Sequence, residues 1–194
     1  MVKNMKKIEN QRGFTMIELM IAVGLIGIVL SGLYQIYSLG WKMFTTGSVQ
    51  IQLQQTARNA MDEMIGEVRQ AKLSTVVISD YLVNLPFSCI TFTDRRNYTV
   101  SYGAVLGTDP SIKGRGIKMD GGYAFIRRVV PLSVTANTAI ATDLLCRNVQ
   151  SVLFTYPQGS DKNTVLCSLT LYKKTYNGMF RTVQLKEVVQ MMNP

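Results

Sequence analysis

The residues with chemical potential lie near the start of the chain, in the segment QRGFTMIE of residues 11–18. An apolar run begins at Phe14, and Glu18 places an ionisable carboxylate four residues into it. A carboxylate at the centre of a membrane helix costs about 2.5–3.5 kcal/mol on insertion scales, and less near the helix end. Glu18 therefore requires a partner, either a positive group or backbone N–H donors.

Two partners for Glu18 agree with the spacing. Thr15 and Glu18 form the S/T-x-x-E pattern of a capping box, in which Glu18 satisfies backbone N–H groups at a helix start. Alternatively, Glu18 pairs with a positive group of another subunit, as expected for an ionisable residue in a membrane segment. Cleavage after Gly13 would free the amine of Phe14, and a neighbouring copy could supply that charge. The spacing favours neither partner over the other.

The apolar run and its flank predict a single membrane span. Phe14 to about Tyr34 gives roughly 20 mostly apolar residues, enough to cross a bilayer as a helix. Residues 1–13 carry four basic side chains against one acidic one, which places this flank in the cytoplasm and the C-terminal body on the other side. The run is longer than that of a secretory signal, and no A-x-A-like cleavage site follows it.

The composition excludes several classes of chemistry. The chain contains no histidine, which removes Ser-His-Asp triads, Cys-His dyads and the usual zinc sites. Cys89, Cys146 and Cys167 are too few for a disulfide framework, although one bridge and one free thiol would fit. Cys167 lies in an alternating run and is expected to be a buried thiol. We therefore expect neither an enzyme nor a protein with a cofactor or metal.

The rest of the chain predicts an α+β fold. Apolar residues recur at spacings of three and four on one helix face: Leu53, Ala57, Ala60, Met61, Met64, Ile65, Val68 and Ala71. With no proline to interrupt it, the helix is expected to run from Phe14 to about Lys72. Seven β-rich runs follow, at 75–79, 87–93, 98–102, 123–130, 149–156, 164–174 and 181–189. Asn177-Gly178 is the best hairpin signal, and we predict a long helix packed on an antiparallel sheet.

The string QRGFTMIELMIAVGLIGIVL closely resembles the prepilin N-terminal motif of type IV pilins and type II secretion pseudopilins. The resemblance implies that a prepilin peptidase cuts between Gly13 and Phe14 and N-methylates the Phe14 amine. It also implies that Glu18 pairs with the N-terminus of a neighbouring subunit during filament assembly. Many major pilins carry a proline in the membrane helix, whereas this chain has none before Pro86. Only Gly24, Gly27 and Gly32 are obvious weak points there, and close helix packing is the alternative reason for them.

The resemblance also implies an organisation and a location. Residues 1–13 correspond to a leader peptide, 14–72 to the long N-terminal helix with 14–34 in the membrane, and 73–194 to a β-rich globular domain. The expected location is the bacterial inner membrane, with one span and a periplasmic C-terminal domain, and then the filament. The implied partners are the prepilin peptidase, other major or minor pilins, the inner-membrane assembly platform and the lipid bilayer.

The favoured function is a minor pilin-like subunit that initiates or caps a type IV pilus. Residues 55–72 and the last three strands are similar to those of PilW-like minor pilins and J-type minor pseudopilins. The alternatives are a minor pseudopilin of a type II secretion system, or a pilin-like module for DNA uptake or adhesion.

The net charge of +9 could serve a nucleic-acid partner, the less favoured reading. Its candidate cations are Lys113, Arg115 and Lys118, or Arg127 and Arg128, and no interleaving of aromatic and basic residues singles them out. The loop 107–122 lacks the pattern of a nucleotide-binding loop. The acidic residues Asp109, Asp120 and Asp161 lack the spacing of a calcium loop.

Overall fold

The computed structural model of this chain describes residues 13–80, 87–106, 122–131, 141–157, 163–176 and 178–192. The chain forms two compact units, residues 1–44 and residues 45–194. The 53-residue helix α1 (Met16–Val68) contributes its first part to one unit and its last part to the other. Each unit is described below by itself.

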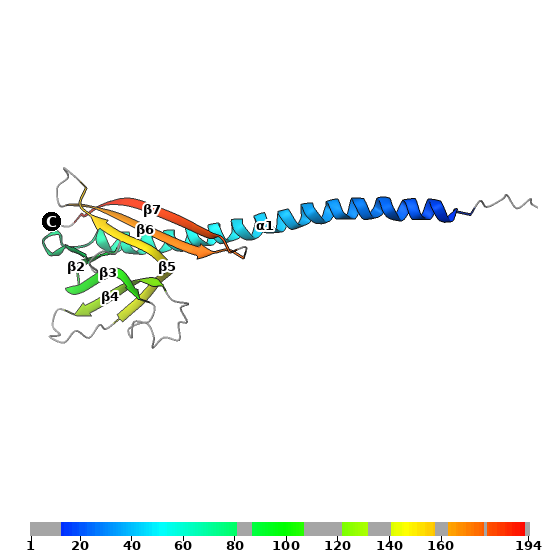
Figure 1. The fold of residues 1–194 in the computed structure, drawn as a ribbon. Helices are drawn as coiled ribbons and strands as arrows, with labels where there is room; N and C mark the ends of the chain where they lie inside the picture. The colour runs from blue at the N-terminus through cyan, green and yellow to red at the C-terminus, as the bar shows by residue number, and fades with distance from the viewer. Residues whose placement is uncertain are drawn as a thin grey trace, which may run out of the picture. The chain divides into compact units, whose positions relative to one another are not determined.

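Seven strands of the second unit form one antiparallel sheet, in which each strand pairs with the next along the chain (Figure 1). A short 3₁₀ turn, η1 (Leu73–Thr75), connects α1 to the sheet. The strands are β1 (Val77–Asp80), β2 (Ser88–Thr93), β3 (Tyr98–Leu106), β4 (Tyr123–Pro131), β5 (Ala141–Thr155), β6 (Thr164–Lys174) and β7 (Phe180–Gln190). This order needs only hairpin-like connections, which agrees with the turn residues between the runs.

The strand β5 changes partner along its length. Its first part pairs with β4 as far as Val149, and its last part pairs with β6 from Val149 onward. At this point Asn148 has a φ of 59°, in the left-handed region that asparagine tolerates better than most residues. Register shifts lie on both sides of it. These bulges bend β5 and let one strand belong to both parts of the sheet.

The sheet curls so that β2 also meets β5. Phe87 forms a parallel bridge with Val152, and the Phe154 N–H donates to the Ser88 hydroxyl at 2.6 Å. Ser88 is buried, with 2% of its surface exposed, so this bond satisfies a hydroxyl that would otherwise lose its hydration. The curl closes one face of the sheet around an apolar interior.

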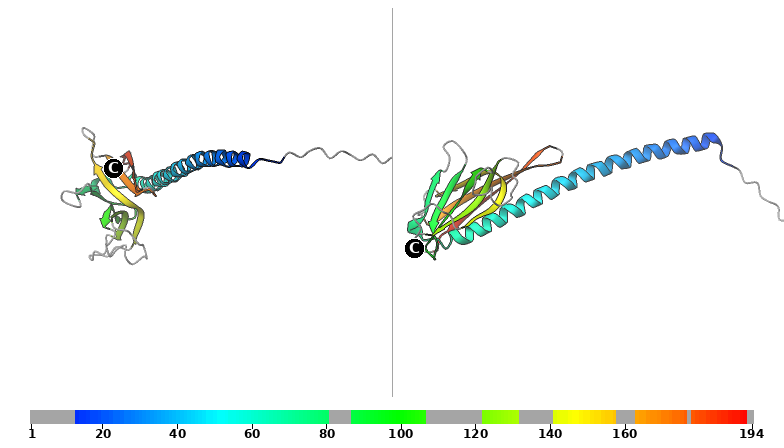
Figure 2. Two further views of the ribbon diagram at one scale, coloured as in Figure 1. Left: turned by 45° about the vertical axis from the view of Figure 1, so that its right-hand side comes forward. Right: turned by 90° about the horizontal axis from the view of Figure 1, so that it is seen from below.

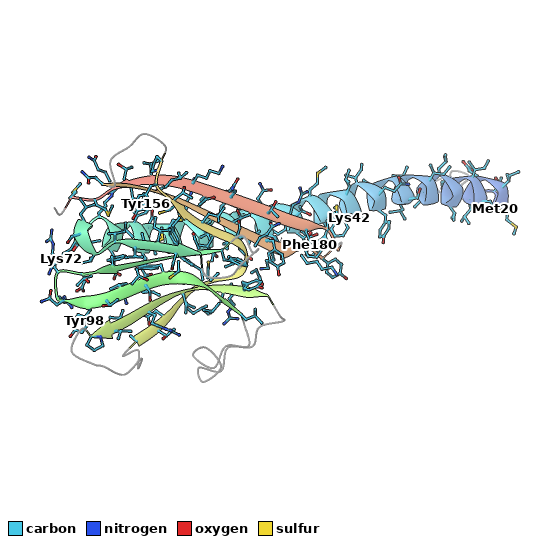
Figure 3. The ribbon with its side chains drawn as sticks, turned by 60° about the vertical axis from the view of Figure 1, so that its left-hand side comes forward. Met20, Lys42, Lys72, Tyr98, Tyr156 and Phe180 are labelled. Atoms are coloured by element: carbon cyan, nitrogen blue, oxygen red, sulfur yellow. The ribbon has the colours of Figure 1, made fainter. Side chains whose placement is uncertain are left out.

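The last part of α1 lies along this inner face (Figure 2). All eight residues of the predicted helix stripe are buried, and Ala57, Met64, Val68 and Ala71 are fully inaccessible. They pack against the inward side chains of the strands, among them Tyr102, Phe125 and Leu169. Figure 3 shows the side chains between this part of α1 and the sheet. Arg58, Asp62 and Arg69 are exposed on another face, as the periodicity indicated.

The predicted α+β fold is confirmed, and so are the helix and all seven strands. The helix begins two residues later and ends four residues earlier than expected, within the usual variation of helix ends. The prediction for β5 was wrong at its start, because the strand begins at Ala141 and not at Val149. The bulge at Asn148 hides this continuity by breaking the alternation of buried and exposed residues.

The three cysteines are free thiols, and all of them are buried. Burial raises the pKa of Cys146 and Cys167 to about 12, and it also raises that of Cys89. Each thiol is therefore protonated and shielded at neutral pH, which makes it inert to thiol reagents in the folded chain. The expectation that Cys167 is buried is confirmed.

The packing of α1 on the sheet predicts that replacing isoleucine by alanine changes the stability of the sheet unit differently at two positions of the helix. Ile65→Ala should lower the free energy of unfolding of the sheet unit by about 2–5 kcal/mol, because it leaves a cavity under a buried side chain. Ile51→Ala on the same helix should change it by less than about 0.5 kcal/mol, since Ile51 is 57% exposed. Exposure of the buried thiols to a thiol reagent in a denaturant titration, in detergent micelles, measures both. Equal effects would contradict this packing.

Candidate functional site

The start of α1 is capped by the residues that the sequence singled out. Thr15 precedes the first helical residue, and its side-chain oxygen accepts a hydrogen bond from the Glu18 N–H at 3.3 Å. The Thr15 carbonyl accepts from the Leu19 N–H at 3.2 Å, which is the first bond of the helix. Thr15 is therefore the N-cap, and one half of the predicted capping box is formed.

The other half of the capping box is not formed among the described residues. The Thr15 N–H makes no hydrogen bond to the Glu18 carboxylate, although both residues are described. Glu18 is exposed and lies in the first turn of α1, where the helix dipole favours a negative charge. The start of the helix is therefore capped by the Thr15 side chain, and the Glu18 carboxylate takes no part in this cap.

Gly13 lies just before this cap, and no packing contact explains why this residue is glycine. A β-carbon added there would meet no atom within 4 Å, and the position lacks the positive φ that favours glycine. Phe14 is 81% exposed. Packing against the described residues therefore does not require glycine at residue 13.

In the first unit, the part of α1 from Met16 to Leu33 is mostly apolar, and no other described residue covers it. The large apolar residues of this segment are between 56% and 82% exposed, on every side of the helix. A helix that is apolar all round belongs in lipid or in a larger protein core. In the described part of the chain, α1 is long and apolar enough to cross a membrane.

Aromatic residues follow the apolar stretch on α1. Tyr34, Tyr37, Trp41 and Phe44 lie within eleven positions of each other, and the rings of Trp41 and Phe44 are 6.4 Å apart. Tyrosine and tryptophan gather at membrane–water interfaces because one part of the ring system is apolar and another is polar. These residues therefore fit the level of the lipid headgroups at the C-terminal end of a span.

The open glycines of the first unit agree with contacts to other helices. A β-carbon at Gly24, Gly27 or Gly32 would meet no atom within 4 Å. None of the three is needed for packing inside the chain, and α1 continues through all of them. Small residues let helix backbones approach closely in a membrane, so this part of α1 is suited to packing against neighbouring helices.

A polar cluster that the sequence reading missed joins α1 to the sheet. The Glu67 carboxylate of α1 accepts a hydrogen bond from the Tyr102 hydroxyl at 2.7 Å and two from the Arg127 guanidinium. Arg127 also donates to the Asp143 carboxylate at 3.0 Å. Tyr102, Arg127 and Asp143 are direct cross-strand neighbours on β3, β4 and β5. Only the sheet register brings them together, so no local sequence pattern could have revealed the cluster.

The electrostatics of the cluster follow from its geometry. The hydrogen bond to Glu67 raises the pKa of Arg127 above its ordinary value, and burial together with Glu67 raises that of Tyr102. Both groups therefore keep their protons throughout the physiological range. The fork of Arg127 contacts two carboxylates at once, a geometry that lysine cannot reproduce.

This cluster corrects the reading of Arg127 as a surface cation. Its side chain is 22% exposed and is paired with Glu67 and Asp143, so it is not available for a nucleic-acid phosphate. Arg128 is half-buried, and its Nε is buried without a hydrogen-bond partner among the described residues. The other candidate cations, Lys113, Arg115 and Lys118, lie outside the described residues.

The acidic residues considered for calcium, Asp109, Asp120 and Asp161, also lie outside the described residues. Within the described ranges, no group of three or more potential ligands could hold a metal ion.

Comparison with known proteins gives a match to a family model in the N-terminal segment. The family model of the prokaryotic N-terminal methylation motif matches residues 9–34, which include Gly13, Phe14 and Glu18. No curated protein and no solved structure matches the chain. The motif supports the type IV pilin and pseudopilin superfamily and indicates a prepilin-processed, pilin-like protein. With the apolar helix, the motif fits a membrane-anchored structural subunit.

The polar cluster yields a prediction about the sheet unit. Arg127→Ala should lower its free energy of unfolding by about 1–3 kcal/mol, because Glu67 loses its charged donor in a half-buried setting. Arg127→Lys should restore only part of this, since an ammonium cannot hold both carboxylates in the same geometry. Denaturant titration measures the change, with the exposed Arg58→Ala as the control. A stability loss for Arg58→Ala as large as that for Arg127→Ala would argue against the cluster.

Proposed function

We propose that this protein is a minor pilin-like subunit, processed between Gly13 and Phe14, that helps to initiate or cap a type IV pilus filament. The observation that carries the proposal is the helix start, where Thr15 provides the cap and the Glu18 carboxylate stays exposed. A charge in this position within an apolar segment calls for a cationic partner. The methylation motif at residues 9–34 supports the same reading.

In this proposal, cleavage creates the partner of Glu18. Removal of residues 1–13 frees the Phe14 amine, and N-methylation leaves that amine basic and positively charged. The amine of one subunit then pairs with the Glu18 carboxylate of its neighbour inside the apolar bundle. An unpaired charge is costly in such surroundings, so the pair favours subunits in one relative register. The Thr15 cap holds the helix start before assembly without using this carboxylate.

The proposed organisation follows from the same segment. Residues 1–13 are the cytoplasmic leader, 14–72 form the long helix with 14–34 in the inner membrane, and 73–194 form the periplasmic globular domain. The assignment to a minor subunit is supported by the similarity of residues 55–72 and the closing strands to PilW-like minor pilins and J-type minor pseudopilins. The proposed partners are the prepilin peptidase, other pilins and the inner-membrane assembly platform.

Substitution of Gly13 should separate processing from folding. Gly13→Leu in the full chain, expressed with a prepilin peptidase, should leave an uncleaved precursor. The open space around Gly13 means that leucine will not disturb the chain itself. Gly27→Leu, at an equally open position, should still be cleaved and methylated at Phe14. Intact mass and N-terminal sequencing measure both, and a product that begins at Phe14 from Gly13→Leu would refute the cleavage site.

The charge of Glu18 can be tested apart from its position in the capping box. Both Glu18→Ala and Glu18→Gln should insert and be cleaved normally but enter filaments about tenfold less or worse, because the cationic partner is left unpaired. Glutamine serves in a capping box as well as glutamate does, so only the charge-pairing role is lost in Glu18→Gln. The amount of subunit in sheared filaments is the measurement.

The control for Glu18 is another exposed glutamate of the same helix. Glu63→Gln removes one negative charge from α1 outside the proposed membrane segment and should leave filament incorporation unchanged. Normal incorporation of Glu18→Gln would refute charge pairing as the role of this residue.

A further inference from the structure

A groove that the proposed function does not use lies between the last part of α1 and strand β5. Its volume is about 530 Å³. This is within the range of about 300–1,000 Å³ that is usual for ligand sites. The described residues that line it come from α1 between 52 and 59, from β5 at 144–148, and from β6 at Lys173. All of them belong to the sheet unit, and we call this feature the β5 groove.

The β5 groove opens where β5 and β6 part. The two strands pair with each other only as far as Val149 and Leu171. Beyond this point β6 continues to Lys174 paired with β7, and β5 runs back to Ala141 paired with β4. Among the described strands, none pairs with the other edge of β5 over residues 141–148. This stretch of β5 therefore has one edge that still offers its main-chain groups.

The β5 groove lies at this strand edge and not on one face of the sheet. Two of its lining residues, Leu144 and Cys146, belong to different faces. Cys146 packs in the inner core, whereas Leu144 packs with Ala124 and Ile126 in a small cluster on the other face. A cavity that touches side chains of both faces runs along the edge, where the N–H and C=O groups of the strand project.

The opposite wall of the β5 groove is one polar face of α1. Gln52, Gln55, Thr56 and Asn59 line it, at the spacings of three and four that place residues on one side of a helix. Three of these four side chains are amides, which both donate and accept hydrogen bonds. This wall can therefore bond to the peptide groups and polar side chains of a ligand.

The charge at the β5 groove is positive. Arg147 and Lys173 line it, and no acidic side chain is among its described lining residues. The Lys173 ammonium donates to the Gln52 side chain at 3.2 Å, and this neutral partner cancels none of its charge. A ligand that carries carboxylates would meet complementary charge here.

We infer that the β5 groove binds an extended acidic segment of a partner protein, which adds as a strand to the edge of β5. Main-chain hydrogen bonds to residues 144–148 hold the segment, as in other cases of strand addition. Its acidic side chains lie near Lys173 and Arg147 and make the binding selective. The inference depends neither on the membrane span nor on the role of Glu18.

The strand edge is the reason to favour a peptide over an acidic carbohydrate. A carbohydrate could bond to the amides and the cations, but it has no row of N–H and C=O groups at the strand spacing. Another peptide backbone has such a row and matches the edge of β5. The sequence reading missed this groove because it arises from the parting of β5 and β6 next to the bulge at Asn148.

The first test uses a fluorescein-labelled peptide of about ten residues that alternates glutamate with threonine, a residue that favours strands. Fluorescence anisotropy measures its binding to the full chain in non-ionic detergent micelles. It should bind at least about tenfold more tightly than a matched lysine–threonine peptide, and its affinity should fall as salt is added. Equal affinities for the two peptides would overturn the inference.

Backbone methylation separates strand addition from attraction by charge. The glutamate–threonine peptide with methylated backbone nitrogens keeps its carboxylates but cannot donate main-chain hydrogen bonds. It should bind at least about tenfold more weakly than the unmethylated peptide, because main-chain bonds supply the affinity of an added strand. An unchanged affinity would show that charge alone holds the peptide, which contradicts strand addition.

Neighbouring residues of the chain supply matched variants. Gln54 and Gln55 are both exposed on α1, but only Gln55 lines the groove. Gln55→Trp should fill the groove and remove most of the peptide binding, whereas Gln54→Trp should bind like the parent chain. Lys173→Glu should weaken binding at least about fivefold, and Lys174→Glu, at an adjacent position outside the groove, by less than about twofold.

These variants also give the results that would overturn the inference. Inert thiols confirm that each variant is folded, so a loss of binding is not a loss of structure. Equal losses for the two glutamine variants, or for the two lysine variants, would show that the peptide binds elsewhere. Binding of polygalacturonate without binding of the glutamate–threonine peptide would identify an acidic carbohydrate as the ligand instead.

Discussion

The burial of one helix stripe against the curled sheet is the contact on which the rest of the sheet unit depends. Ala57, Met64 and Val68 are fully inaccessible because the inner faces of the strands close over them. Apolar burial stabilises by about 25 cal/mol per Å² of surface removed from water, and this interface removes the whole apolar stripe of the helix from water. The Glu67–Arg127 cluster then fixes how the helix is aligned with the strands, because its hydrogen bonds form only in one register of helix and strands.

The two parts of α1 have different surroundings. Its C-terminal part is apolar on one face and packs on the sheet, whereas its N-terminal part is apolar on all faces and is covered by no other described residue. The second pattern requires lipid or neighbouring helices. In the proposed function, one such surface serves both in the membrane and in the filament, since lipid tails and apolar helices offer it similar surroundings.

In the proposed function, Glu18 is the one charged residue that gives this apolar segment specificity in packing. Apolar packing alone permits many relative positions of two helices, whereas a single charge that must meet a single amine permits few. The Thr15 cap is important here because it satisfies the helix start without the carboxylate.

Local patterns in the sequence determined most of the elements. The spacing of Leu53 to Ala71 predicted the helix face, the alternation around Cys167 predicted a buried strand, and the order of residues from Gly13 to Glu18 located the candidate site. These features depend on residues that are close in sequence, so the periods of helix and strand express them directly. The start of β5 was missed because the bulge at Asn148 interrupts the period on which such a prediction relies.

Tertiary structure alone decided the features that depend on register. Nothing near Arg127 in the sequence indicates that Glu67 and Asp143 will pair with it, because sixty and sixteen residues separate them from it. The β5 groove likewise exists only because β5 and β6 part at Val149. The sequence by itself determined the anchor, the processing motif and the kinds of element. The folded sheet decided which charged side chains are paired inside the protein and which are exposed at its surface. The physical reason is that only strand pairing sets the neighbours of each side chain.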